Sequence, residues 1–290
     1  MRKILFLSLI ALIFSSCTIK ATYNRLDWVL GNYLEQYVEL SGAQQIALKQ
    51  QLAKTLAWHR TTQLPVYATW LQSVKYDVQH GLTETQVEQH TLELFLYWRA
   101  LMMRFADDMA LMLPTLSAEQ RAELFENFAS KNAEYEDRYI KVTRQQQRDN
   151  YTERLEDSFD SWLGSLNRQQ QQMIQTAALE LQPIAAQSLQ MRQRWQRQLK
   201  HVLETQQAGA SMHLAMQTLF VNPESLRSNT YKQMLEHNRQ VITRLIVAIA
   251  HTLSDEQHQY FNERIDKYVK LFNELAAEAQ PNAGPQCEAC

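Results

Sequence analysis

The sequence predicts an all-α protein, an elongated multi-helix bundle with long, partly kinked helices. The chain is rich in Ala, Leu, Glu and Gln, which favour helices. It holds only six glycines and six prolines among 290 residues, so few positions interrupt a helix. A five-residue pattern that is typical of helix starts recurs five times. These three observations together argue against a β-sheet.

The first segment, residues 1–16, is predicted to be a lipoprotein signal peptide. Two basic residues precede an apolar run of eleven residues, Ile4 to Phe14, and two serines lead to Cys17. The run is too short for a membrane-spanning helix, which needs about 20 apolar residues. A cysteine directly after two small residues resembles a bacterial lipobox. We therefore expect Cys17 to become the first residue of the mature chain and to carry acyl chains such as palmitate.

The compartment and the partners follow from this segment and from the charge. Thr18 stands where an Asp would retain a lipoprotein in the inner membrane, so the resemblance implies a lipid anchor in the outer membrane, facing the periplasm. A secreted protein with an incidental cysteine is the alternative. Without Arg2 and Lys3 the formal net charge falls from −2 to −4. The chain has no basic block, so we expect a membrane contact through Cys17 and no nucleic acid partner.

The mature chain is predicted to form one all-helical periplasmic domain over residues 17–280. Pro65 and Pro183 interrupt helical patterns, and each is expected to kink its helix. The stretch from Gln145 to Tyr151 is polar on every side, which predicts a solvated part of its helix. Helices are expected at 43–80, 84–112, 117–162, 168–206, 223–251 and 255–279, with shorter ones at 24–39 and 211–220.

Most of these helices begin with the recurring pattern Leu-[Ser/Thr/Asn]-x-x-Gln. The spacing predicts a capping box, in which the first polar side chain accepts from the amide three residues on and the Gln side chain accepts from the cap's own amide. Gln170 and Gln257 share a face with apolar residues, so the glutamines are expected along seams between helices. Good helix caps without further function are the alternative. The pairs are Ser41 with Gln44, Thr83 with Gln86, Ser117 with Gln120, Asn167 with Gln170, and Ser254 with Gln257.

Apolar stripes at helical spacing predict an ordinary core, and we assign no ligand to them. One stripe holds Leu94, Trp98, Leu101, Phe105 and Met112. Another holds Leu124, Phe128, Tyr135, Tyr139 and Val142.

The candidate interaction residues are Trp58, His59, Arg60 and Tyr67. Arg and Trp are frequent anchors of protein interfaces, and His changes its charge near neutral pH. A purely structural contact is the alternative, because His59 falls on a helix face with leucines, where one hydrogen bond satisfies it.

Two cysteines, Cys287 and Cys290, lie in a predicted flexible tail, residues 281–290. Their C-x-x-C spacing suits thiol exchange or zinc, but the segment before them, 281–285, is rich in Pro and Gly and offers no helix start. A disulfide or two free thiols is therefore expected, without a metal or cofactor. Phosphate-binding, acyl-transfer and zinc-hydrolase motifs are absent from the sequence, so we expect no enzyme.

Three segments carry a resemblance to a known family. The segments 23–28, 58–67 with its Trp-His-Arg and Leu-Pro-x-Tyr motifs, and 154–164 resemble an uncharacterised family of helical lipoproteins from Gram-negative bacteria. The segment 82–86 has a weaker resemblance to periplasmic stress proteins that carry a Leu-Thr-x-x-Gln motif. We expect a non-catalytic interaction or scaffold module whose grooves between capped helices receive a protein partner. The alternative is a chaperone-like or stress-sensing protein.

Overall fold

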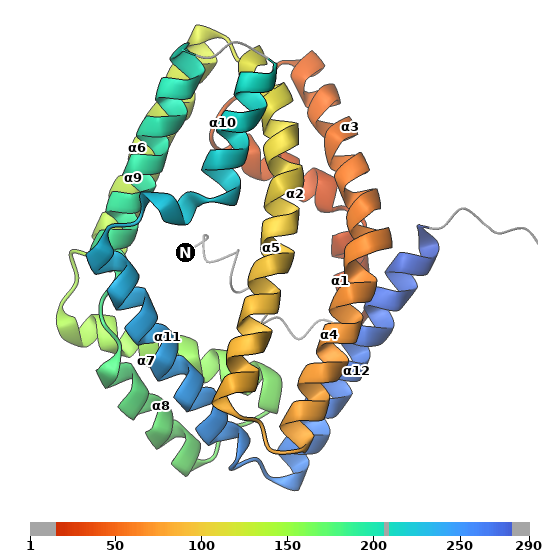
Figure 1. Cartoon of the computed structure of the whole chain (residues 1–290), viewed down its shortest axis with the longest axis vertical. Coiled ribbons are helices and arrows are strands. Elements are labelled where there is room, and N and C mark those ends of the chain that lie inside the picture. The colour runs from red at the N-terminus through yellow and green to blue at the C-terminus, as the bar shows by residue number, and fades with distance from the viewer. Residues whose placement is uncertain (1–15, 206–208, 280–290) are drawn as a thin grey trace, which may run out of the picture.

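The computed structural model describes residues 16–205 and 209–279, and it contains helices and no strands over those ranges (Figure 1). The predicted all-α bundle is therefore confirmed. Residues 1–15 of the predicted signal peptide and the predicted tail with Cys287 and Cys290 lie outside the described residues.

The helices follow one another with short connections. They are α1 (Ser16–Tyr23), α2 (Leu26–Leu34), α3 (Gly42–Trp58), α4 (Leu64–Gln79), α5 (Glu84–Met112), α6 (Ala118–Tyr139), α7 (Arg144–Leu163), α8 (Arg168–Glu180), α9 (Ala185–Thr205), α10 (Ala210–Val221), α11 (Asn229–Ala250) and α12 (Asp255–Glu278). A π-helical turn, His59–Gln63, joins α3 to α4, and short 3₁₀ helices cover Leu113–Thr115 and Pro223–Leu226.

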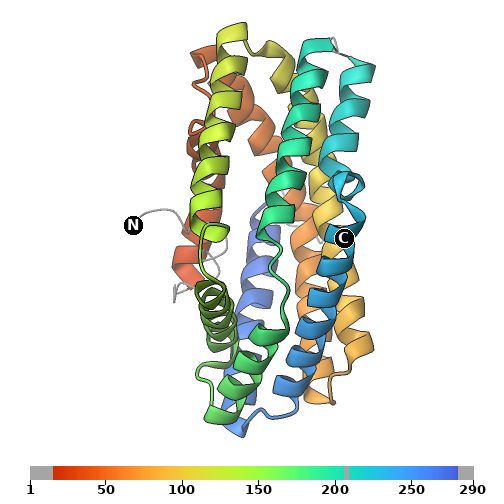
Figure 2. The same ribbon diagram turned by 90° about the vertical axis from the view of Figure 1, so that its left-hand side faces the viewer.

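Two helical columns run the height of the molecule, and the other helices stop near its middle. The joined α3 and α4 form one column and α5 forms the other, whereas α6 and α7, α8 and α9, and α10 and α11 meet at mid-height (Figures 1 and 2). The bundle therefore has an upper and a lower half.

The break between α6 and α7 differs from the single helix expected over 117–162. Thr143 accepts from the amide of Gln146 and the Gln146 side chain accepts from the Thr143 amide, so a sixth capping box begins α7 here. The sequence signal was present but incomplete, because Val142 stands where the other boxes have Leu. A capping box satisfies amide groups that a helix start leaves unpaired, and this stabilises the break.

Pro183 acts differently from the expected kink, and Pro65 follows an irregular turn. Pro183 ends the predicted helix 168–206, and residues 181–184 form no helix. Asn238 of α11 stabilises this break, because its side chain accepts from the amide of Gln182 at 2.8 Å and donates to its carbonyl at 2.9 Å. Pro65 lies just after the π-helical turn, in which the amide of Leu64 donates to the His59 carbonyl. The wider turn lets the helix continue past a residue that has no amide hydrogen.

Each half has its own hydrophobic core. The upper core takes its buried side chains from the segment before α3 and from α3, the C-terminal half of α5, α6, α9 and α10. The lower core takes them from α4, α7, α8, α11 and α12. A smaller cluster of Leu64, Leu271 and Leu275 packs near α1. Among the described residues, none of the helices is both long and apolar enough to span a bilayer.

Candidate functional site

The glutamines of four capping boxes form two pairs, one at each end of the bundle. At the upper end the Nε2 of Gln44 donates to Gln120 Oε1 at 3.0 Å, and the Nε2 of Gln120 donates back to Gln44 Oε1 at 2.8 Å. The Nε2 of Gln44 also donates to the backbone carbonyl of Thr115, and the Nε2 of Gln120 donates to that of Glu39. We call these two residues the upper glutamine pair.

The lower glutamine pair, Gln170 and Gln257, repeats this geometry. Both amide-to-amide hydrogen bonds are 2.9 Å, and the carbonyls of Thr252 and Ser165 accept the remaining Nε2 hydrogens. Gln170 is completely buried. Each Oε1 also accepts from its own cap amide, so the amide groups of both pairs are fully used. The pairs therefore join helix starts far apart in sequence and offer no free group to a ligand.

The fifth predicted box does not join such a pair. The Nε2 of Gln86 donates to Asp77 Oδ1 at 2.8 Å, and His90 lies 2.8 Å from the other oxygen of the same carboxylate. Thr83 still starts α5 with both hydrogen bonds of the capping box.

The Trp-His-Arg block contacts the N-terminal helix α1 and the residue after it. His59 Nδ1 lies 2.7 Å from the Tyr23 hydroxyl, and Arg60 donates to Asn24 Oδ1 at 2.6 Å. The Arg60 guanidinium also stacks over the Tyr23 ring at 5.1 Å. Burial lowers the pKa of His59 to about 4, so His59 is neutral at pH 7.

These contacts leave the candidate residues with unequal roles. His59 and Arg60 are engaged within the chain, and Trp58, at the end of α3, is half-buried. The Tyr67 ring packs against the rings of His59 and Tyr97. Cys17 lies in α1, so the contact joins the segment that carries the predicted lipid to the π-helical turn.

An apolar cavity of about 430 Å³, the lower cavity, opens between α4, α5, α7 and α12. Seven of its ten lining side chains are aromatic, and the other three are leucines. The ten lining residues are Tyr67, Trp70, Leu71, Leu94, Tyr97, Trp98, Leu101, Trp162, Tyr268 and Phe272.

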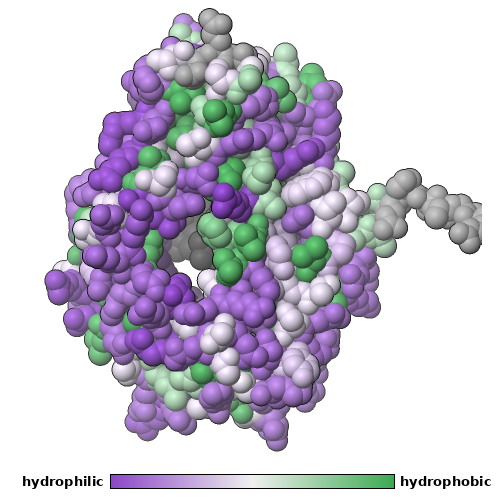
Figure 3. Space-filling model, viewed as in Figure 1, coloured by the Kyte–Doolittle hydropathy of each residue, from purple (hydrophilic) through white to green (hydrophobic). Residues whose placement is uncertain are grey.

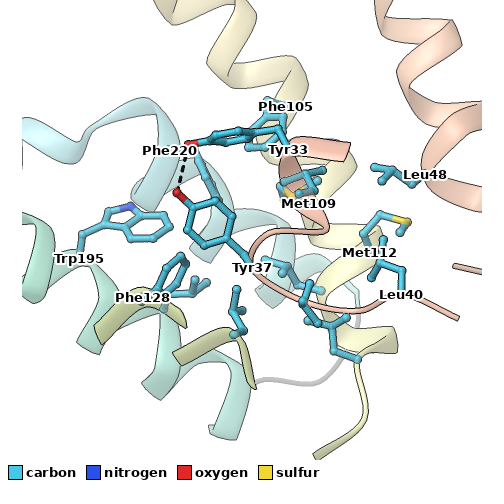
Figure 4. A pocket seen from close by; sticks show the side chains of 16 residues that line it. Tyr33, Tyr37, Leu40, Leu48, Phe105, Met109, Met112, Phe128, Trp195 and Phe220 are labelled. Atoms are coloured by element: carbon cyan, nitrogen blue, oxygen red, sulfur yellow. Dashed lines mark hydrogen bonds between the residues drawn. The ribbon is translucent and has the colours of Figure 1, made fainter. Parts of the chain in front are cut away.

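A second apolar cavity, the upper cavity, measures about 400 Å³ and lies among α2, α3, α5, α6, α9 and α10. Figure 4 shows the rings of Phe105, Phe128, Trp195 and Phe220 around it. The only hydrogen bond drawn among its lining side chains joins the hydroxyls of Tyr33 and Tyr37 at 3.1 Å. Both cavities are therefore surrounded almost entirely by carbon.

The middle of α5 carries large apolar side chains that neighbouring helices leave uncovered. Leu94 and Trp98 were expected in the core, but they are 47% and 56% exposed because they line the open lower cavity. On the opposite side of α5, Leu92, Leu96 and Met103 are also exposed. We call these three residues the outer stripe. Figure 3 shows a hydrophobic patch beside a hollow at the centre of the molecule, where α5 runs in Figure 1.

Groups of acidic, histidine or cysteine side chains that could hold a metal ion are not found within residues 16–205 and 209–279. The arrangement offers two kinds of surface instead, an apolar interior and an apolar helix face.

Comparison with known sequences assigns the chain to a family. A model of the family of unknown function DUF6279 matches residues 36–232, well over half of the chain. The chain belongs to this family. The DUF6279 match includes the Trp-His-Arg block, the upper glutamine pair and Gln170, but it ends before Gln257. No curated protein and no solved structure matches the chain.

Proposed function

We propose that this DUF6279 protein is a non-catalytic binding protein of the bacterial envelope, anchored in the outer membrane by lipid on Cys17 and facing the periplasm. Its partner is an amphipathic helix of another envelope protein, which binds the outer stripe of α5. The observation that carries the proposal is the exposure of the outer stripe. Leu92, Leu96 and Met103 are 58%, 51% and 49% exposed, in the middle of a long helix.

The outer stripe continues a helix-packing face that is covered in the upper half. Leu96, Met103 and Ala110 follow one another at intervals of seven residues, the spacing of a helix-packing seam. Ala110 is only 2% exposed, in a core that includes Met212 and Met216 of α10. In the lower half, α11 packs less extensively against α5 than α10 does above. A partner helix beside the outer stripe would extend the packing that α10 begins.

The proposed binding site is therefore on α5 and not at the Trp-His-Arg block that the sequence suggested. His59 and Arg60 already bind Tyr23 and Asn24, so both side chains have a structural role within the chain. Burying a half-exposed Leu contributes about 1 kcal/mol, so Leu92 and Leu96 together would supply a useful part of a transient interface.

Photo-crosslinking in cells tests the proposal. A photoreactive residue at Leu96 of the full-length chain should give one dominant adduct, mapped by mass spectrometry to an amphipathic helix. Leu92→Glu should abolish this adduct. Leu111→Glu is the matched control, because Leu111 is equally exposed on α5 but lies away from the outer stripe. An adduct that survives Leu92→Glu would refute the proposed surface.

A chaperone-like role is the second candidate, favoured by exposed apolar residues on several sides of α5, including Phe95. A chaperone would give many adducts with unrelated exported proteins, each reduced only slightly by Leu92→Glu. The lipid anchor has its own test. Cys17→Ser should release the protein from the membrane fraction and remove incorporation of labelled palmitate.

A further inference from the structure

The two apolar cavities lie on the inner side of α5, opposite the outer stripe. At about 100° per residue, Leu94, Trp98 and Leu101 fall roughly 180–240° round the helix from Leu92. A helix bound to the outer stripe would therefore not fill either cavity. The interior needs an occupant of its own.

The cavities lie next to each other along one face of α5, and we call the two together the channel. Leu101 lines the lower cavity and Phe105 lines the upper one, and these residues are one turn apart on the same face of α5, a rise of about 6 Å. From Leu94 to Met112 the lining face of α5 extends about 27 Å. One acyl chain spans half of a bilayer core, about 15 Å, so the channel has the length of two chains placed end to end.

The size and chemistry of the lining exclude a peptide as the occupant. A helix is 10–12 Å across, so two turns of it take up on the order of 1000 Å³, more than twice the volume of either cavity. An extended peptide would lose hydrogen bonds of its backbone amides in a wall of aromatic and aliphatic carbon, which is costly. A methylene group fills roughly the volume of one water molecule, about 30 Å³, so the 430 Å³ of the lower cavity hold roughly 14 of them.

We propose that the channel binds the acyl chains of a membrane lipid, one chain in each cavity. The two cavities have nearly equal volumes, about 400 and 430 Å³, so each suits one chain of similar length. In this proposal the lipid enters through the hollow at the centre of the molecule, beside α5 (Figure 3).

The lipid is a separate molecule and not the anchor on Cys17. Lys20 of α1 pairs with Glu274 and Glu278 of α12. These carboxylates lie about 120° round α12 from Tyr268 and Phe272, which line the lower cavity. Lys20, three residues after Cys17, is therefore held on a different face of α12 from the one that faces the channel, whereas Tyr23 at the end of α1 packs near Tyr268 and Phe272.

Binding of palmitate to the mature chain with Cys17→Ser, below the concentration at which palmitate forms micelles, tests the proposal. Four of the six tryptophans, Trp70, Trp98, Trp162 and Trp195, line the cavities, so dibrominated stearate should quench most of the tryptophan fluorescence. Calorimetry should find two palmitates per chain. From octanoate to palmitate the affinity should rise up to about fourfold per methylene, which corresponds to roughly 0.8 kcal/mol.

A charge at the mouth of the lower cavity gives the decisive comparison. Trp98→Glu should weaken binding to the lower cavity at least tenfold and leave one palmitate per chain, whereas Trp98→Phe should keep two. Trp98 is more than half exposed, so the charge is not buried and the fold should persist in circular dichroism. Leu111→Glu is the matched control and should keep two sites.

Three results would overturn the proposal. One is the absence of saturable binding, and another is equal binding by Trp98→Glu and Leu111→Glu. The third is a mature lipidated chain that binds no added palmitate while the Cys17→Ser chain binds two, because the anchor itself would then occupy the channel. None of these results depends on the partner that binds the outer stripe.

Discussion

Replacing Gln170 with Ala tests whether the lower glutamine pair joins the two helix starts. The substitution leaves the cap amide of Asn167 and one Nε2 hydrogen of Gln257 without acceptors, and the carbonyl of Thr252 without its donor. Gln170 is 0% exposed, so water cannot replace these partners. A buried unsatisfied group costs about 1–3 kcal/mol, which predicts a loss of about 3–5 kcal/mol in the free energy of unfolding.

Urea unfolding followed by circular dichroism measures this loss. Gln146→Ala is the matched control, because Gln146 accepts from its cap amide in the same way but is exposed and bonds to no other helix. Its loss should be about 1 kcal/mol or less. The double variant with Gln257→Ala should cost less than the sum of the two single variants, by about 1–3 kcal/mol. Equal losses for Gln170→Ala and Gln146→Ala would refute the reasoning.

Three further predictions concern other parts of the bundle. Burial holds the pKa of His59 at about 4, below its unfolded value of about 6.5. The free energy of unfolding should therefore fall by up to about 3 kcal/mol as the pH is lowered from 6.5 to 4. Urea titration of His59→Gln should show that this part of the pH dependence is lost. Gly164→Ala should lower the free energy of unfolding by about 1–2 kcal/mol, because Gly164 has φ +87° and a new Cβ would lie 3.3 Å from the Tyr260 ring. Gly31→Ala lies in open space within α2 and should instead raise the melting temperature. Asn238→Ala should destabilise the chain by about 1–2 kcal/mol and speed proteolysis between α8 and α9, and unchanged cleavage there would contradict its role in the break.

Local signals predicted most of the helices because capping and helix propensity act within a few residues. Ser41, Thr83, Ser117, Asn167 and Ser254 all begin helices with both hydrogen bonds of the capping box. The prediction of one helix over 117–162 was wrong where the local pattern changed by one residue, at Val142. The prediction that Pro183 only kinks a helix was wrong because Asn238, on a distant segment, satisfies the interrupted backbone.

The candidate site was predicted less well, because it depends on which helices are neighbours. Helical spacing placed Leu94 and Trp98 on one apolar face of a helix, and both line the same cavity. Spacing alone could not show that the facing helices leave this face open. The outer stripe was missed, although the seven-residue interval between Leu96, Met103 and Ala110 was a signal in the sequence.

The sequence by itself determined the fold class, the five helix starts with the recurring pattern and the membership in DUF6279, because these rest on propensity, capping and residue identity. Only the tertiary structure decided that Gln44 meets Gln120 and Gln170 meets Gln257, and that the inner face of α5 borders two cavities. Such pairings arise from segments more than 70 residues apart. Their choice follows from how whole helices pack, which no local pattern encodes.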